Sequence, residues 1–186
     1  MNKDSKMYSG YPALVTVVGV KYKDKVNYMA AAWHSYLSHT PPVYSVSISP
    51  KRFTHDMILR AGEFNCNFLP FDKVEAVHGT GRTSGKAINK IATLKLDTRS
   101  GETINAPFLS DAYAVLECKL IKNITIGDHT LFMGEIKNTV NLKGSLTETG
   151  LVNIEEISPV LYLGSDNYVR ITSSEIKRLP REFKIS

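Results

Sequence analysis

Segments with the composition of β-strands follow one another along this chain, and only short helical stretches separate them. Residues 14–20 read LVTVVGV, a β-branched run, and residues 43–49 read VYSVSIS, which alternates apolar with polar side chains. β-branched runs and period-two alternation are typical of strands, and the alternation indicates a strand with one buried face. Because strands and long helices do not alternate, a parallel βαβ sheet is not expected. We therefore predict a mostly β fold with short helices, in which an antiparallel sheet closes into a barrel.

The individual elements are predicted from the same patterns and from turn residues. The expected strands are residues 14–20, 26–33, 43–49, 63–69, 112–121 and 131–141, with short closing strands at 160–163 and 168–171. Between the second and third strands we expect a loop that Pro41-Pro42 closes. Residues 53–61 are predicted to form a helix with Thr54 as its N-cap and Gly62 at its end. Residues 72–91 are predicted to be helical or irregular, because three glycines interrupt them.

The length and charge of the chain limit its architecture and its partners. It has 186 residues, 42% of them hydrophobic and 22% charged, which suits one globular domain over residues 1–186. The formal net charge of +5 raises the hypothesis of a small barrel that binds single-stranded nucleic acid. The excess of positive charge lies at the two ends of the sequence. Residues 1–25 and 170–186 each carry a net charge of +3, whereas residues 26–169 hold 13 basic and 14 acidic side chains. We therefore expect no nucleic-acid partner.

The patterns of cysteine, histidine and hydropathy exclude further classes. Cys66 and Cys118 lie 52 positions apart with no CxxC or Cys/His cluster, which suits a protein of the reducing cytoplasm. Cys118 is expected to be a small buried hydrophobe. Residues 26–50 contain no charged side chain, but they include Pro41-Pro42 and two histidines, so no membrane span is predicted. The five histidines show no metal-binding spacing, so no metal site is predicted.

Two segments could hold an anion. Residues 49–55, SPKRFTH, lie where a strand is predicted to end and a helix to begin, and a helix N-terminus beside two cations attracts phosphate. The alternative is that Thr54 caps the helix while the cations are solvated. Residues 79–86, GTGRTSGK, match neither a P-loop nor a dinucleotide fingerprint. That segment, with Lys90 beyond it, is either an anion-holding loop or an ordinary solvated loop.

Two other segments could contact a flat ligand. Residues 27–35, NYMAAAWHS, place small side chains beside Trp33, so a ring could approach the backbone and the indole could form its wall. The alternative is a packed strand with a core tryptophan. His129 follows Gly127-Asp128 at a predicted turn. It could contact a cofactor or shuttle a proton, or it could belong to an Asp-His pair that caps the turn.

Taken together and in this order, these segments resemble the flavin reductase-like family, whose fold is the FMN-binding split barrel, with flavoredoxin as the most similar subgroup. The resemblance covers about residues 11–165 and leaves residues 166–186 as a C-terminal extension. It is carried by NYMAAAWHS at 27–35, PPVYSVSISPKRFTH at 41–55, GEFNCNFLP at 62–70, GRTSGK at 81–86, AVLEC at 114–118 and GDHTLFMGEI at 127–136. Asn89 departs from the pattern, since family members often carry Asp before the lysine at this place.

The resemblance implies a bound FMN and assigns residues to its parts. Those expected along the flavin ring are Asn27, Ala30, Ala31, Ala32, Trp33 and Tyr162, with the alanines contributing backbone and the tyrosine covering the ring. Those expected on the phosphate side are Ser49, Arg52, Thr54 and Lys90. His129 would stand near the flavin as the candidate catalytic residue, where a hydride donor could also approach.

The expected function combines this resemblance with what the sequence lacks. It contains no nucleophile elbow, acid–base pair or metal cluster, so the reactive group would belong to a cofactor. We expect an NAD(P)H-dependent flavin oxidoreductase that passes hydride from NADH or NADPH to FMN and electrons on to flavin, ferric iron or a protein acceptor. The alternative is an FMN-binding electron carrier of flavoredoxin type, which takes electrons from a redox protein partner. The resemblance also implies a homodimer.

Overall fold

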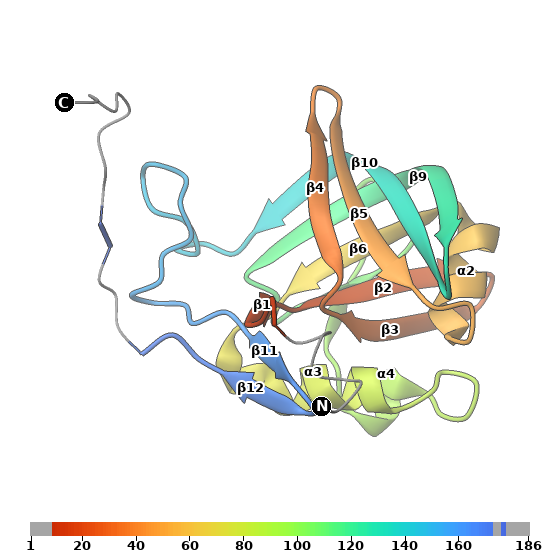
Figure 1. Ribbon diagram of the computed structural model, residues 1–186, viewed down its shortest axis with the longest axis horizontal. Helices are drawn as coiled ribbons and strands as arrows, with labels where there is room; N and C mark the ends of the chain where they lie inside the picture. Colours follow the sequence, from red (N-terminus) through yellow and green to blue (C-terminus); the bar gives the residue numbers. More distant parts are fainter. Residues whose placement is uncertain (1–8, 173–175, 178–186) are drawn as a thin grey trace.

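A seven-stranded antiparallel sheet dominates the computed structural model, which describes residues 9–172, 176 and 177 (Figure 1). Its strands lie in the order β3-β2-β6-β9-β10-β5-β4. They comprise β2 (Thr16–Tyr22), β3 (Lys25–Ala31), β4 (His34–His39), β5 (Pro42–Ile48), β6 (Glu63–Phe68), β9 (Ala114–Ile126) and β10 (His129–Asn141). The prediction of a mostly β fold with an antiparallel sheet is confirmed by these pairings.

Shorter elements surround this sheet. The helices are α2 (Phe53–Ala61), the 3-10 turn η1 (Phe71–Lys73), α3 (Val74–Arg82) and α4 (Lys90–Thr93). The small strands are β1 (Ala13–Leu14), β7 (Thr98–Arg99), β8 (Phe108–Leu109), β11 (Leu161–Gly164) and β12 (Asn167–Val169). Figure 1 shows α3, α4 and the β11–β12 hairpin gathered on the same side of the sheet, next to β3. Of these, α3 and the β11–β12 hairpin form one wall of the groove described below.

The sheet is not closed into a barrel, so that part of the predicted fold is not confirmed. Its two edges are β3 and β4, which follow one another in the chain but are not paired with each other among the described residues. The physical reason lies at the β3 edge, where the carbonyl of Tyr28 accepts a hydrogen bond from the buried ammonium of Lys90 instead of from a strand. Helical segments therefore cover an edge that a closed barrel would have paired.

Two hydrophobic clusters pack on the faces of the sheet. One cluster lies against α2 and includes Val18, Phe64 and Phe132. The other lies against α3 and includes Val17 and Val77. Successive side chains of a strand point to opposite faces, and the adjacent residues Val17 and Val18 are both buried. The strand β2 is therefore covered on both sides. That explains why residues 14–20 read as a continuous apolar run.

Three local predictions were wrong. Residues 34–39 form an edge strand, not a loop, because polar and exposed side chains hid the pairing of β4 with β5. The N-cap of α2 is Arg52, without a side-chain cap, and Thr54 lies inside the helix. The loop predicted for residues 79–86 is wrong in its first half, because residues 79–82 belong to α3, whereas the prediction of a helical or irregular segment over residues 72–91 is confirmed. Gly62 does end α2, in the left-handed conformation with φ of 68°.

Some expectations concern residues beyond those that the structure describes. The predicted extension over residues 166–186 and the basic ends fall partly on residues 1–8, 173–175 and 178–186, which lie outside the described ranges. Within those ranges, no helix is long and apolar enough to cross a membrane. The same ranges contain no group of three or more His, Cys, Asp or Glu side chains that could hold a metal ion.

Candidate functional site

Two adjoining cavities form one groove along the end of β3. Their volumes are about 310 and 180 Å³, and both are lined by Ala30, Ala31, Ala32, Arg52 and Gly81. The larger cavity, called here the first cavity, is completed by Val15, His78, Arg82, Tyr162, Asp166 and Tyr168. The smaller one, the second cavity, is completed by Met29, Trp33, Ser47, Ile48, Ser49 and His129. Residues from widely separated parts of the sequence thus meet at one place.

The floor of the groove is built from residues with little or no side chain. A Cβ atom placed on Gly81 of α3 would lie only 3.3 Å from the Cβ of Ala30 on β3, so the helix and the strand approach closely there. A larger residue at Gly81 would fill the groove, because it would project against the alanine floor. Small side chains thus line both cavities, and the approach of a flat ligand to this backbone stays a prediction.

Lys90 holds the two sides of this floor together. Its Nζ donates 2.7 Å hydrogen bonds to the carbonyls of Tyr28 on β3 and Thr80 on α3. Burial, together with the nearby charge of Arg52, lowers the pKa of Lys90 to about 8. The ammonium thus lies behind the groove, and its predicted role as a phosphate-side cation stays a prediction.

A chain of aromatic contacts runs along the groove. The rings of Trp33 and His129 lie 4.8 Å apart between centroids, and the indole nitrogen donates a 3.0 Å hydrogen bond to the hydroxyl of Tyr11. Tyr11 in turn packs edge-on against Tyr162 at 5.6 Å, and Tyr162 lies 5.2 Å from Tyr168. Trp33 is 40% exposed, so it is not the core tryptophan of the alternative interpretation. This arrangement offers aromatic surface on both sides of the small-residue floor.

His129 is oriented by its neighbour in the sequence. Its Nδ1 lies 2.7 Å from a carboxylate oxygen of Asp128, and a carboxylate accepts, so Nδ1 carries the proton and donates. The hydrogen bond and the charge of His129 lower the pKa of Asp128. With Nδ1 engaged, Nε2 is the nitrogen available to a ligand in the second cavity.

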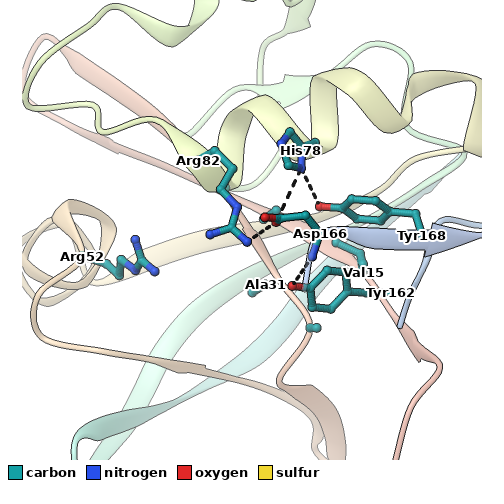
Figure 2. Close-up of a pocket in the computed structure, with 11 residues that line it drawn as sticks. Val15, Ala31, Arg52, His78, Arg82, Tyr162, Asp166 and Tyr168 are labelled. Carbon is teal, nitrogen blue, oxygen red and sulfur yellow. Dashed lines mark hydrogen bonds and ion pairs between the residues drawn. The ribbon is translucent and has the colours of Figure 1, made fainter. Parts of the chain in front are cut away.

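An ion pair crosses the wall of the first cavity (Figure 2). The guanidinium of Arg82, in the last turn of α3, contacts the carboxylate of Asp166 in the turn between β11 and β12. Nδ1 of His78 lies 3.2 Å from the Tyr168 hydroxyl and 3.9 Å from the same carboxylate. The backbone N–H of Asp166 also donates to the Tyr162 hydroxyl at 3.3 Å. This cluster fastens the hairpin to the helix.

Arg52 lies where the two cavities meet and differs from Arg82 in its surroundings. None of the salt bridges among the described residues includes Arg52, and its side chain is exposed. It stands at the N-terminus of α2, where backbone N–H groups add a partial positive charge. The combination provides uncompensated positive charge at the junction of the two cavities, and the hypothesis that residues 49–55 hold an anion stays a prediction.

Asn27 and Thr54 form a buried pair between β3 and α2. The Asn27 Nδ2 donates a 2.7 Å hydrogen bond to the Thr54 hydroxyl, which joins β3 to α2. Both side chains are buried, and the Oδ1 of Asn27 has no hydrogen-bond partner. A buried acceptor without a partner is costly, so this atom is a candidate to receive a donor from a ligand.

The structure thus brings together most of the residues singled out from the sequence. The residues of that set that line the groove are Ala30, Ala31, Ala32, Trp33, Ser49, Arg52, His129 and Tyr162. Asn27, Thr54 and Lys90 lie behind it. Sequence reasoning missed His78 of α3, for which there was no local signal. It also missed Asp166 and Tyr168, whose only local signal was the polar turn between the two closing strands.

Comparisons with known proteins agree with this geometry. The family profile described as the flavin reductase like domain matches residues 7–169. The crystal structure of an FMN-binding protein from Thermus thermophilus is 36% identical, with a TM-score of 0.84 over 92% of this chain and 93% of that one. Flavoredoxin of Desulfovibrio vulgaris is 29% identical, with a TM-score of 0.83 over 95% of this chain and 97% of that one.

Two curated relatives are also similar to this chain in sequence. An NADH-dependent FAD reductase of Streptomyces globisporus is 26% identical over 68% of this chain and 71% of its own length. A relative from Aeropyrum pernix is 32% identical over 83% of this chain, which spans 58% of that relative's length. Solved structures similar in fold include flavoredoxins and FMN-binding proteins. With its family profile matching nearly the whole described range, the chain belongs to the flavin reductase-like family.

Proposed function

We propose that this chain binds FMN in the groove and works as an NAD(P)H-dependent flavin oxidoreductase. It would pass hydride from NADH or NADPH to the flavin and electrons on to flavin, ferric iron or a protein acceptor. The observation that carries the proposal is the groove itself: a floor of small residues, an uncompensated Arg52 at the junction of its two cavities, and aromatic rings on both sides. A phosphate-bearing, flat and redox-active ligand matches all three features.

The residues present fit that cofactor. The approach of Gly81 to Ala30 leaves room for a ring over the backbone, which any larger side chain at Gly81 would take away. The free Oδ1 of Asn27 offers a buried acceptor, and the ribityl hydroxyls of FMN are donors. Arg52 and the start of α2 supply positive charge for one phosphate.

Each part of the groove would then have a task. FMN, when bound, supplies the redox chemistry, because its ring accepts a hydride and passes electrons on. Arg52 would bind the phosphate, and the backbone of Ala30–Ala32 would approach the ring. Trp33 and Tyr162 would limit the access of water from two sides. His129 would present Nε2 to the donor or acceptor, with its orientation held by Asp128.

The named relatives support this proposal without deciding the electron donor. A reductase that uses NADH and a flavoredoxin are both similar to the chain. The second candidate, an FMN-binding electron carrier served by a redox protein partner, therefore rests on the similarity to flavoredoxin. Both candidates use the same groove.

One spectroscopic experiment tests the function and separates the two candidates. The purified chain, supplied with FMN and freed of excess flavin, is titrated without oxygen with NADH, then NADPH, then dithionite. Rapid bleaching of the flavin absorbance by a pyridine nucleotide is the expected result. Bleaching by dithionite alone would favour the electron carrier, and a chain that retains no flavin at all would contradict both candidates.

We also propose that the protein is a homodimer in a reducing cytoplasm. The two cysteines are buried free thiols, and burial raises the pKa of Cys118 to about 12, so neither depends on an oxidising environment. The dimer is supported by the family resemblance and by exposed apolar side chains discussed below.

A further inference from the structure

We propose that Asp166 is a positioning residue that holds Arg82 and cancels much of its charge. Through this pair the protein would set the charge facing a flavin ring in the first cavity, and with it the relative affinity for the oxidised and reduced ring. This inference rests on the proposed function, since it concerns the same groove. It adds a specific role for two residues, one of which the sequence did not indicate at all.

The pair faces the part of the groove where the ring is expected. Among the residues that the family resemblance assigns to the ring, Ala30–Ala32 and Tyr162 line the first cavity together with Arg82 and Asp166. The alanines also line the second cavity, where Trp33 lies. Figure 2 shows the two charged groups in contact beside Tyr162, with Arg52 across the cavity. Asp166 also binds Tyr162 through its own backbone N–H, so one residue fixes both a charge and a ring-covering aromatic.

The charge of the pair would matter because a reduced flavin ring is an anion at neutral pH, whereas the oxidised ring is neutral. A cation near the ring therefore favours the reduced form, and a carboxylate favours the oxidised form. In contact, Arg82 and Asp166 nearly cancel each other's field at a distance. Removing either charge would leave the other uncompensated. Loss of the carboxylate would favour the reduced ring, and loss of the guanidinium would favour the oxidised ring.

The chain offers variants that separate charge from structure. Asp166 has φ of 65°, a left-handed conformation that asparagine tolerates well, so Asp166→Asn keeps the turn. The asparagine Oδ1 can still accept a hydrogen bond from Arg82. Arg82→Gln removes the opposite charge and keeps a donor at the end of α3. The double variant restores neutrality with neither charge present.

The test is the midpoint potential of bound FMN, measured at one pH, with the affinity for oxidised FMN measured in parallel. Asp166→Asn should raise the ratio of reduced to oxidised affinity about tenfold, which is about 30 mV for a two-electron couple. Arg82→Gln should lower that ratio by a similar factor. The double variant should return close to the wild type. Asp56→Asn, which breaks the exposed Arg60–Asp56 pair on α2, is the matched control and should leave the potential unchanged.

Opposite shifts that cancel in the double variant would support the charge role. The charge role would be overturned if the midpoint potential shifted in the same direction in both single variants, or in neither. A purely structural role predicts the same direction of shift in both, because either variant breaks the same contact. If wild-type protein binds no flavin, the proposed function fails and this inference fails with it. If wild-type protein binds flavin and the potentials do not follow the charges, only the inference fails.

Discussion

Arg52, Arg82 and Lys90 are three cations near one groove, and their surroundings put them in three different states. Lys90 is buried and bonded to two carbonyls, with its pKa lowered to about 8 by burial and by the charge of Arg52. Arg82 is paired with Asp166. Arg52 is exposed and has no salt bridge in the described part of the chain. An anionic ligand therefore gains most from Arg52, since there it displaces no existing partner.

Arg52→Gln should weaken binding of FMN but not of riboflavin, which lacks the phosphate. Hydrogen bonds to a charged group contribute about 1.5–3 kcal/mol, so the FMN dissociation constant should rise about tenfold to a hundredfold. Quenching of flavin fluorescence measures both affinities. Lys51→Gln removes a neighbouring exposed cation that lines neither cavity and should change neither value. An equal loss of affinity for FMN and for riboflavin would show that Arg52 does not contact the phosphate.

At the scale of elements, the segment between β7 and β8 is held by a buried carboxylate of β9. Glu117 is fully buried and accepts hydrogen bonds from the backbone N–H groups of Glu102 and Thr103, both at 2.9 Å, and from the Thr103 hydroxyl. The amide Nδ2 of Asn138 on β10 also donates to Glu117, at 3.2 Å, and no salt bridge in the described ranges includes this carboxylate. The same part of the chain is bonded to β6, where Asn65 donates to the carbonyl of Ala106 and Asn67 accepts from the N–H of Leu109.

Glu117→Gln should destabilise the fold, because an amide nitrogen would face donors that need an acceptor. The loss of charge-assisted hydrogen bonds and one unsatisfied buried donor should together lower the free energy of unfolding by on the order of 3 kcal/mol. Urea denaturation followed by far-UV circular dichroism measures the loss. Glu155→Gln, at an exposed position, is the control and should unfold at the wild-type midpoint. Equal midpoints for the two variants would mean that the loop is not anchored through Glu117.

At the scale of the whole molecule, the open sheet leaves apolar surface beside the groove. Ile124 and Ile126, which lie on one face of β9, are 41% and 64% exposed. Ile126 pairs with His129 across the β9–β10 turn, so this surface adjoins the second cavity. An association that covers about 800 Å² of each partner is typical of stable dimers. This apolar surface next to the groove is where we expect the second copy of the chain to pack.

Light scattering should give a mass near twice the 20.7 kDa of one chain, because burial of this surface favours association. Replacing Ile124 and Ile126 together by lysine should shift the mass toward that of one chain. Leu151→Lys, at an exposed position in the segment after β10, is the control and should leave the dimer intact. A wild-type monomer that binds FMN tightly would contradict the dimer.

The sequence by itself determined most of the strands and most residues of the groove. Apolar alternation in residues 43–49, the β-branched run of residues 14–20 and the glycine that ends α2 are local signals, and local patterns specify strands and turns. Only the tertiary structure decided which cations are free, which edge strand stays open and which residues close the first cavity. Arg82 meets Asp166 across 84 positions of sequence, and Lys90 meets Tyr28 across 62. Such pairings depend on how distant elements pack, and no local pattern encodes the burial that fixes their charges.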